Sequence, residues 1–90
     1  MEIEFDRIKA AENLLRHGVG FPHATQALRD PQGVTLEDPD ALGEQRLVTL
    51  GMDALGRVLV VVYTPRAECA RLISARKASK GEAALYARRI

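Results

Sequence analysis

The unbroken apolar run Val58-Leu59-Val60-Val61-Val62-Tyr63 constrains the fold of this chain more than any other segment. Its β-branched residues favour a strand, and the lack of polar alternation indicates that both faces of that strand are covered. The chain has 90 residues, which is enough for one domain with a modest core. We therefore expect a single domain over residues 1–90, with this run as the central strand of its sheet.

Three helices and four further strands are predicted around the central strand. Apolar alternation or β-branched composition predicts strands at residues 3–5, 34–36, 45–50 and 71–76. Helical spacing predicts helices at residues 7–17, between Phe21 and Asp30, and after the capping-box sequence Ser79-Lys80-Gly81-Glu82. Residues 37–43 and 65–68 are expected to form an acidic loop and a turn. The resulting order, β-α-α-β-β-β-β-α, predicts an α+β fold with an antiparallel sheet packed against helices.

The first predicted helix has an apolar face and a polar face. Asp6 is a good N-cap, and Gly18 can take the left-handed conformation that ends a helix. The polar face carries Lys9, Asn13 and His17, each one turn from the next. The apolar stripe consists of Ile8, Ala11 and Leu15, with Leu14 beside it. We expect this stripe, rather than the polar face, to contact the core.

The composition excludes several classes of protein and site. No apolar segment approaches the roughly 20 residues that a membrane span requires, and the first residues lack the basic and apolar regions of a secretory signal. The single Cys69 excludes an internal disulfide and a zinc site built from cysteines. No glycine-rich phosphate loop or metal-ligand spacing is visible, so neither a metal nor a cofactor is expected. These features predict a cytoplasmic protein.

The charge is divided unevenly along the chain, although the net charge is only +1. Residues 1–45 contain four Lys or Arg and nine Asp or Glu, a net charge of −5. Residues 46–90 contain nine Lys or Arg and three Asp or Glu, a net charge of +6. This asymmetry favours a polyanionic or acidic partner for the second half. The alternative is that the two halves attract each other within one fold.

Two motifs near the ends of the chain carry a family resemblance. The first is Phe5-Asp6-x-x-Lys9-x-x-x-Asn13-Leu14-x-x-His17-Gly18-Val19-x-Phe21. The second is Arg71-Leu72-Ile73-Ser74-Ala75-Arg76-Lys77-Ala78, followed by Glu82 and Tyr86. In their order and spacing, the chain resembles the BrnT family of toxins over nearly its whole length. Many members of that family have Trp at the position of Phe5.

The resemblance implies both a fold and a function. The fold would be RelE-like and α+β, and the protein would be the toxin of a type II toxin–antitoxin pair. It would act as a metal-independent endoribonuclease that cleaves RNA and arrests growth. Its partner would be a BrnA-like antitoxin with a ribbon-helix-helix end, and the hetero-oligomer would reach operator DNA only through that antitoxin.

Four residues form the expected catalytic set: Lys9, His17, Arg71 and Arg76. Metal-free cleavage of RNA needs a base for the 2′-OH proton, cations for the phosphorane and an acid for the leaving 5′-oxygen. Histidine changes charge near neutral pH, and arginine binds phosphate oxygens in pairs. The alternative is that His17 only caps its helix and that the arginines form ordinary ion pairs.

The positions of Arg71 and Arg76 limit whether both can belong to one site. Arg71 and Arg76 lie five residues apart on one predicted strand. Strict alternation places them on opposite faces, so they can share a site only if one lies at a strand end or the strand bulges.

Four more residues are expected to bind RNA: Arg46, Ser74, Lys77 and Tyr86. Arg46 either binds phosphate or pairs with the acidic loop at 37–44. Ser74 bonds either to a phosphate or to a neighbouring strand. Tyr86 either stacks on a base or packs in the core.

The leading prediction is a small ribonuclease toxin that leaves a 2′,3′-cyclic phosphate. Arg71, Arg76 and Lys77 would stabilise the phosphate, and Lys9 or His17 would transfer protons. The alternative is a non-catalytic binding module of the same fold, whose basic face docks an acidic protein or nucleic-acid partner.

Overall fold

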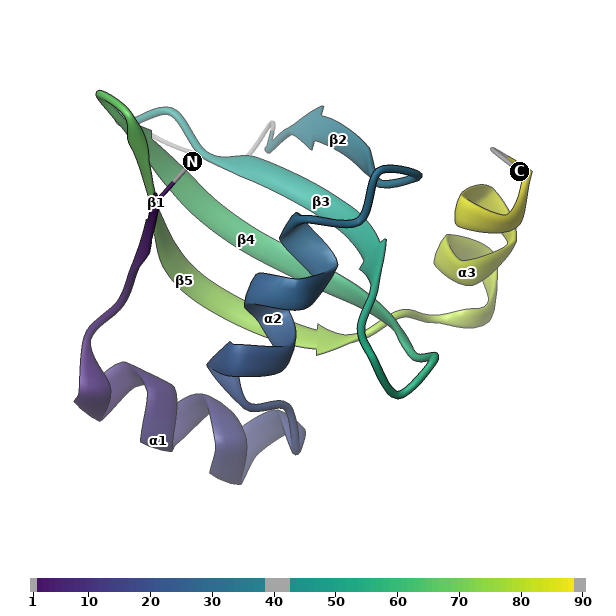
Figure 1. The fold of residues 1–90 in the computed structure, drawn as a ribbon, viewed down its shortest axis with the longest axis horizontal. Coiled ribbons are helices and arrows are strands. Elements are labelled where there is room, and N and C mark those ends of the chain that lie inside the picture. The colour runs from purple at the N-terminus through teal and green to yellow at the C-terminus, as the bar shows by residue number, and fades with distance from the viewer. Residues whose placement is uncertain (1, 39–42, 89–90) are drawn as a thin grey trace.

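The computed structural model describes residues 2–38 and 43–88 of the chain. They form β1 (Glu2–Glu4), α1 (Arg7–His17), α2 (Phe21–Leu28), β2 (Val34–Glu37), β3 (Leu47–Met52), β4 (Val58–Arg66), β5 (Cys69–Lys77) and α3 (Lys80–Ala87). The strands build one open sheet in the order β1-β5-β4-β3-β2, with the apolar run on the central strand β4 (Figure 1). The predicted α+β fold and its element order are confirmed.

The sheet is mixed rather than wholly antiparallel. The pairs β2–β3, β3–β4 and β4–β5 are antiparallel as predicted, but β1 runs parallel to β5. The sequence pattern does not determine this direction, because all the other elements of the sheet lie between β1 and β5 along the chain. β1 pairs only with Cys69–Arg71, so the outer edge of β5 continues beyond the end of β1.

Several strand boundaries differ from the predicted ones. β3 begins at Leu47 rather than at residue 45, and β4 continues through Pro65 to Arg66. The turn is confined to residues 67–68, where Ala67 has a left-handed φ of 50°. The prediction of a turn from residue 65 was wrong because a proline near the end of a strand does not stop the strand. Residues 39–42 of the predicted acidic loop lie outside the described residues.

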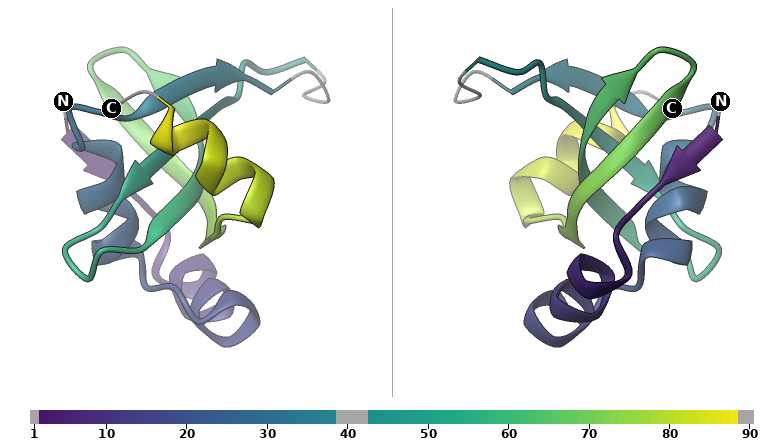
Figure 2. Two further views of the ribbon diagram at one scale, coloured as in Figure 1. Left: turned by 90° about the vertical axis from the view of Figure 1, so that its right-hand side faces the viewer. Right: turned by 90° about the vertical axis from the view of Figure 1, so that its left-hand side faces the viewer.

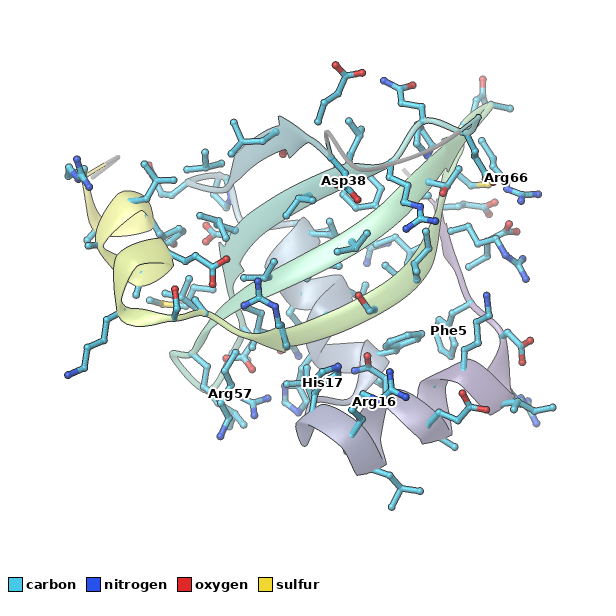
Figure 3. All side chains as sticks on the ribbon, turned by 180° about the vertical axis from the view of Figure 1, so that it is seen from behind. Phe5, Arg16, His17, Asp38, Arg57 and Arg66 are labelled. Carbon is cyan, nitrogen blue, oxygen red and sulfur yellow. The ribbon has the colours of Figure 1, made fainter. Side chains whose placement is uncertain are left out.

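Helices cover the two faces of the sheet unequally. Figure 2 shows α2 and α3 on opposite sides of the sheet, with α1 beside its β5 edge. α2 covers the larger core, which contains Val19, Phe21, Ala24, Ala27, Leu59, Val61, Tyr63, Ala70, Leu72 and Ala75. α3 covers the smaller core of Val34, Leu50, Val60 and Tyr86, and no helix covers the rest of that face in Figure 3. None of the helices within residues 2–38 and 43–88 has the length and apolar character needed to cross a membrane.

The orientation of α1 is the opposite of the one predicted. Its apolar stripe points into solvent, whereas Asn13 of the polar face is buried against β5. The unpaired part of the β5 edge explains why the polar face of α1 turns toward the sheet. β5 has backbone groups beyond β1 that no strand pairs, and buried backbone groups of this kind need hydrogen-bond partners. An asparagine supplies both a donor and an acceptor, which an apolar side chain cannot do.

Candidate functional site

A hollow of about 200 Å³ lies between α1 and the outer edge of β5. It is lined by Lys9, Glu12, Asn13, Arg16 and His17 of α1 and by Ile73 and Ser74 of β5. Figure 3 shows Arg16 and His17 in the space between the helix and the strand. The hollow therefore brings together Lys9, His17 and Ser74, three of the residues that the sequence predicts for the site.

Asn13 holds α1 in the orientation that creates this hollow. Its amide nitrogen donates to the carbonyl oxygens of Val19, at 2.9 Å, and Ala75, at 2.8 Å. Its side-chain oxygen accepts from the backbone N–H of Ala75 at 3.0 Å. Lys9 and His17 lie one helical turn before and after Asn13. Both side chains are therefore placed along β5 by a residue that is fixed to that strand.

The helical side of the hollow gathers groups that bind anions. Lys9, Arg16 and the ionisable His17 line the hollow together with the carboxylate of Glu12. No salt bridge involves Lys9 or Arg16 within the described residues. His17 occupies the last turn of α1, before Gly18 with its left-handed φ of 70°. The arrangement suits a phosphate group.

A bulge in β5 places the predicted arginines on the same face of the sheet. The β4–β5 ladder shifts register midway, and Ile73 is the extra residue on β5. Across this bulge, alternation places Arg71, Ser74 and Arg76 on the face away from α2. The condition for Arg71 and Arg76 to share a site is therefore met. Ser74 also lines the hollow, so it connects the hollow to this face.

Both of these arginines already form ion pairs. Arg71 Nη1 lies 3.4 Å from Glu4 Oε1, and both side chains are substantially exposed. Because exposed pairs contribute little to stability, phosphate can compete with Glu4 for Arg71. Arg76 is held more firmly, since its two terminal nitrogens donate to the two carboxylate oxygens of Glu82 at 2.8 and 2.9 Å. These hydrogen bonds lower the pKa of Glu82 to about 2.

The remaining predicted RNA contacts lie outside the hollow. Arg46 is exposed and precedes β3. Lys77 pairs opposite Leu59, whose side chain belongs to the larger core, so Lys77 lies on the α2 side of the sheet. Tyr86 is buried in the smaller core, and its hydroxyl donates a hydrogen bond to Asp30. None of these three residues lines the hollow with Lys9 and His17.

Two charged residues of the hollow, Glu12 and Arg16, are absent from the predicted set, as are Asn13 and Ile73. Glu12 and Arg16 are one helical turn apart, and both lie off the apolar stripe. That spacing beside Lys9 and His17 is the signal by which they could have been found. No group of three or more His, Cys, Asp or Glu side chains in the described residues is arranged to hold a metal ion.

Comparisons with known proteins agree with this architecture. Residues 5–82 match the model of a family described as the ribonuclease toxin BrnT of type II toxin–antitoxin systems. The fold is similar to the crystal structure of the Brucella abortus ribonuclease toxin BrnT, with a TM-score of 0.64 and 26% identity. That similarity covers 89% of this chain and 99% of the Brucella chain. No match was found among curated proteins.

Proposed function

Since the chain belongs to the BrnT family of ribonuclease toxins of type II toxin–antitoxin systems, we propose that it is a metal-independent endoribonuclease that cleaves RNA in the hollow between α1 and β5. One observation carries this proposal. Lys9, Arg16 and His17 converge there with Glu12, and neither Lys9 nor Arg16 is salt-bridged within the described residues. A hollow with cations, an imidazole and a carboxylate contains the groups that metal-free phosphodiester cleavage needs.

The reaction would be an internal transfer at phosphorus. The 2′-oxygen forms a bond to phosphorus, and the bond from phosphorus to the 5′-oxygen breaks. The 2′-hydroxyl proton passes to a base, and an acid gives a proton to the leaving 5′-oxygen. The products are a 2′,3′-cyclic phosphate and a 5′-hydroxyl, and no water or metal ion is consumed in this step.

The residues of the hollow can be assigned to these roles. The carboxylate of Glu12 can accept the 2′-hydroxyl proton, and the imidazolium of His17 can donate to the 5′-oxygen. Lys9 and Arg16 neutralise the charge that builds up on the equatorial phosphate oxygens. In this assignment His17 transfers a proton and Lys9 acts as a fixed positive charge.

The open face of the sheet continues the proposed RNA path. Ser74 belongs to both the hollow and this face, and Arg71 lies further along β5 with an exposed, exchangeable partner. Arg71 is therefore the sheet residue best suited to bind a neighbouring phosphate. Arg76 can add positive electrostatic potential on the same face while its guanidinium group stays hydrogen-bonded to Glu82. Lys77 and Tyr86 do not line the hollow, and their contacts with RNA stay predictions.

The biological setting follows from the family. The family is described as ribonuclease toxins of type II toxin–antitoxin systems, which implies an RNA substrate and an antitoxin partner. We propose that this chain arrests growth by cleaving RNA in the cytoplasm and that a BrnA-like ribbon-helix-helix antitoxin neutralises it. Operator DNA would be bound through the antitoxin in the hetero-oligomer.

The function is tested by incubating the purified chain with a defined single-stranded RNA in EDTA. We expect cleavage, with a 2′,3′-cyclic phosphate at one product end and a 5′-hydroxyl at the other. Cleavage that appears only when a divalent metal is added would contradict the proposed chemistry. Salt-sensitive RNA binding with no cleavage at any protein concentration would support the non-catalytic binding module instead.

A further inference from the structure

The outer face of α1 carries an apolar stripe that is largely exposed to solvent. Ile8 is 70% exposed, Leu14 is 53% exposed and Leu15 is 89% exposed, and Ala11 between them is also exposed. Figures 1 and 2 show no other element on this side of the helix. We call these four residues, Ile8, Ala11, Leu14 and Leu15, the α1 stripe.

The α1 stripe is more than a set of scattered exposed residues. Its members lie within two turns of one helix, and their exposed fractions correspond to roughly 400 Å² of contiguous apolar surface, a size that marks interaction sites. The helix does not need this surface to fold onto the sheet, because Asn13 already anchors the opposite face. The apolar residues of the stripe are therefore available to a second molecule.

The area of the α1 stripe indicates which kind of binding partner fits it. A stable dimer of two folded copies buries about 800 Å² on each partner, roughly twice what the stripe offers. A single amphipathic helix laid along α1 needs less surface, because its apolar side chains at i, i+4 and i+7 match a stripe of this length. The stripe fits a helical segment of another protein better than a second copy of this chain.

The charges beside the α1 stripe define the chemistry of that segment. α1 carries Arg7, Lys9 and Arg16 but a single carboxylate, Glu12. A partner helix with acidic residues beside its apolar face would be complementary to this pattern. Acidic side chains next to Leu15 could also reach Arg16, which lines the hollow.

We propose that the α1 stripe is the docking surface for the antitoxin, which lays an amphipathic helix flanked by acidic residues along it. This inference rests on the proposed function, since the hollow lies around the same helix. Ile8 is adjacent to Lys9, and Leu15 is adjacent to Arg16. A helix on the stripe therefore lies on the outer side of α1, opposite Asn13, and its acidic residues can pair with the cations at the margin of the hollow.

The test measures binding directly and without RNA. The probe is the purified full-length protein encoded by the reading frame next to the gene for this chain, titrated into the chain by calorimetry. Ile8→Glu and Leu15→Glu should each raise the dissociation constant by at least about tenfold, since they place an acidic group at the centre of the interface. Leu55→Glu is the matched control, because Leu55 is 67% exposed and belongs to the β3–β4 loop rather than to α1.

The outcomes separate this proposal from the proposed function. Ile8 and Leu15 do not line the hollow, so both variants should keep the helical circular dichroism and the RNA cleavage of the parent chain. The docking proposal is overturned if both variants bind the probe as tightly as the Leu55→Glu control, or if the parent chain does not bind it. It is also overturned if the chain alone forms dimers that Leu15→Glu dissociates. Absence of RNA cleavage with stripe-dependent binding would contradict only the proposed function.

Discussion

Asn13 shows, at the scale of single residues, how one side chain determines which face of a helix meets the sheet. Its three hydrogen bonds join α1 to Ala75 on β5 and to Val19 after the helix. Each of those backbone groups would otherwise be buried without a partner. The polar face of α1 therefore turns inward, and Lys9 and His17 come to lie over the same strand edge.

Asn13→Ala should lower the free energy of unfolding by about 2–4 kcal/mol, because it leaves buried backbone groups of Ala75 and Val19 unsatisfied. Urea denaturation followed by circular dichroism measures this change. Glu12→Gln, at an exposed neighbouring position, is the control and should unfold close to the parent midpoint. Equal midpoints for the two variants would show that Asn13 does not anchor α1.

The predictable and unpredictable residues of the site differ in their physical basis. Lys9 and His17 could be placed on one face because helical spacing is a local property. The burial of Asn13 could not, because it depends on β1 ending at Glu4 and leaving the edge of β5 open. The common face of Arg71 and Arg76 likewise depends on a bulge at Ile73, which alternation alone does not reveal.

At the scale of elements, α3 is anchored at both of its ends by residues from elsewhere in the chain. At its start, Ser79 and Glu82 form a capping box, and Arg76 of β5 binds the same Glu82. At its other end, the hydroxyl of Tyr86 bonds to Asp30, which follows α2. The capping box was predictable from the Ser-x-x-Glu spacing, but the partners from β5 and from the region after α2 were not, because they are distant in the chain.

The Tyr86–Asp30 contact should make stability depend on alkaline pH. The hydrogen bond to Asp30, burial and the negative charge of Asp30 raise the pKa of Tyr86 from 10.0 to about 12. The folded state therefore holds this proton more tightly than the unfolded state. The stabilisation is fully present below pH 10 and is lost as the pH rises toward 12.

Urea denaturation of the parent chain and of Tyr86→Phe between pH 8 and pH 12 tests this expectation (roughly the window set by the two pKa values). The difference in unfolding free energy between the two proteins should shrink across the upper half of that range. A difference that stays constant with pH would mean that the Tyr86 hydroxyl is not bound to Asp30.

A second element-scale prediction concerns the contact between α2 and β3. A Cβ atom on Gly51 would lie 2.1 Å from the carbonyl oxygen of Ala27, so the helix and strand approach too closely for any side chain. Gly51→Ala should therefore destabilise the fold by roughly 2–3 kcal/mol, as overpacking does. Gly81→Ala on α3 meets nothing within 4 Å and should stabilise by about 0.5 kcal/mol. Thermal unfolding of both variants would contradict this account if Gly51→Ala were as stable as the parent.

At the scale of the whole molecule, the fold redistributes the uneven charge of the chain. The basic second half supplies Arg66, Arg71 and Arg76, but each pairs with a glutamate, namely Glu44, Glu4 and Glu82. The hollow draws its cations from α1, which belongs to the acidic first half. Two of these pairs join the two halves, as the interpretation of mutual attraction expects, whereas the cations of the hollow belong to the acidic half and not to the basic half that was expected to bind a polyanion.

The order of helices and strands was more predictable than the contacts between them. The apolar run, the turn residues and the helical spacing were enough to order all the described elements, because each is a local pattern. The parallel β1–β5 pair and the outward stripe of α1 depend on contacts between residues far apart in the chain. Those contacts create the hollow. The sequence could therefore predict some residues of the site but not their arrangement in space.

The measurement that tests the central claim most directly is the rate of RNA cleavage in EDTA by hollow variants and matched controls. His17→Ala and Lys9→Ala remove groups that line the hollow, whereas His23→Gln and Lys80→Ala alter the same residue types elsewhere. We predict that His17→Ala cleaves at least about a hundredfold more slowly, the range expected for losing a general acid, and that Lys9→Ala is also impaired. Both controls should remain near the parent rate. Parent-like cleavage by the two hollow variants, with their circular dichroism unchanged, would contradict the assignment of the active site to this hollow.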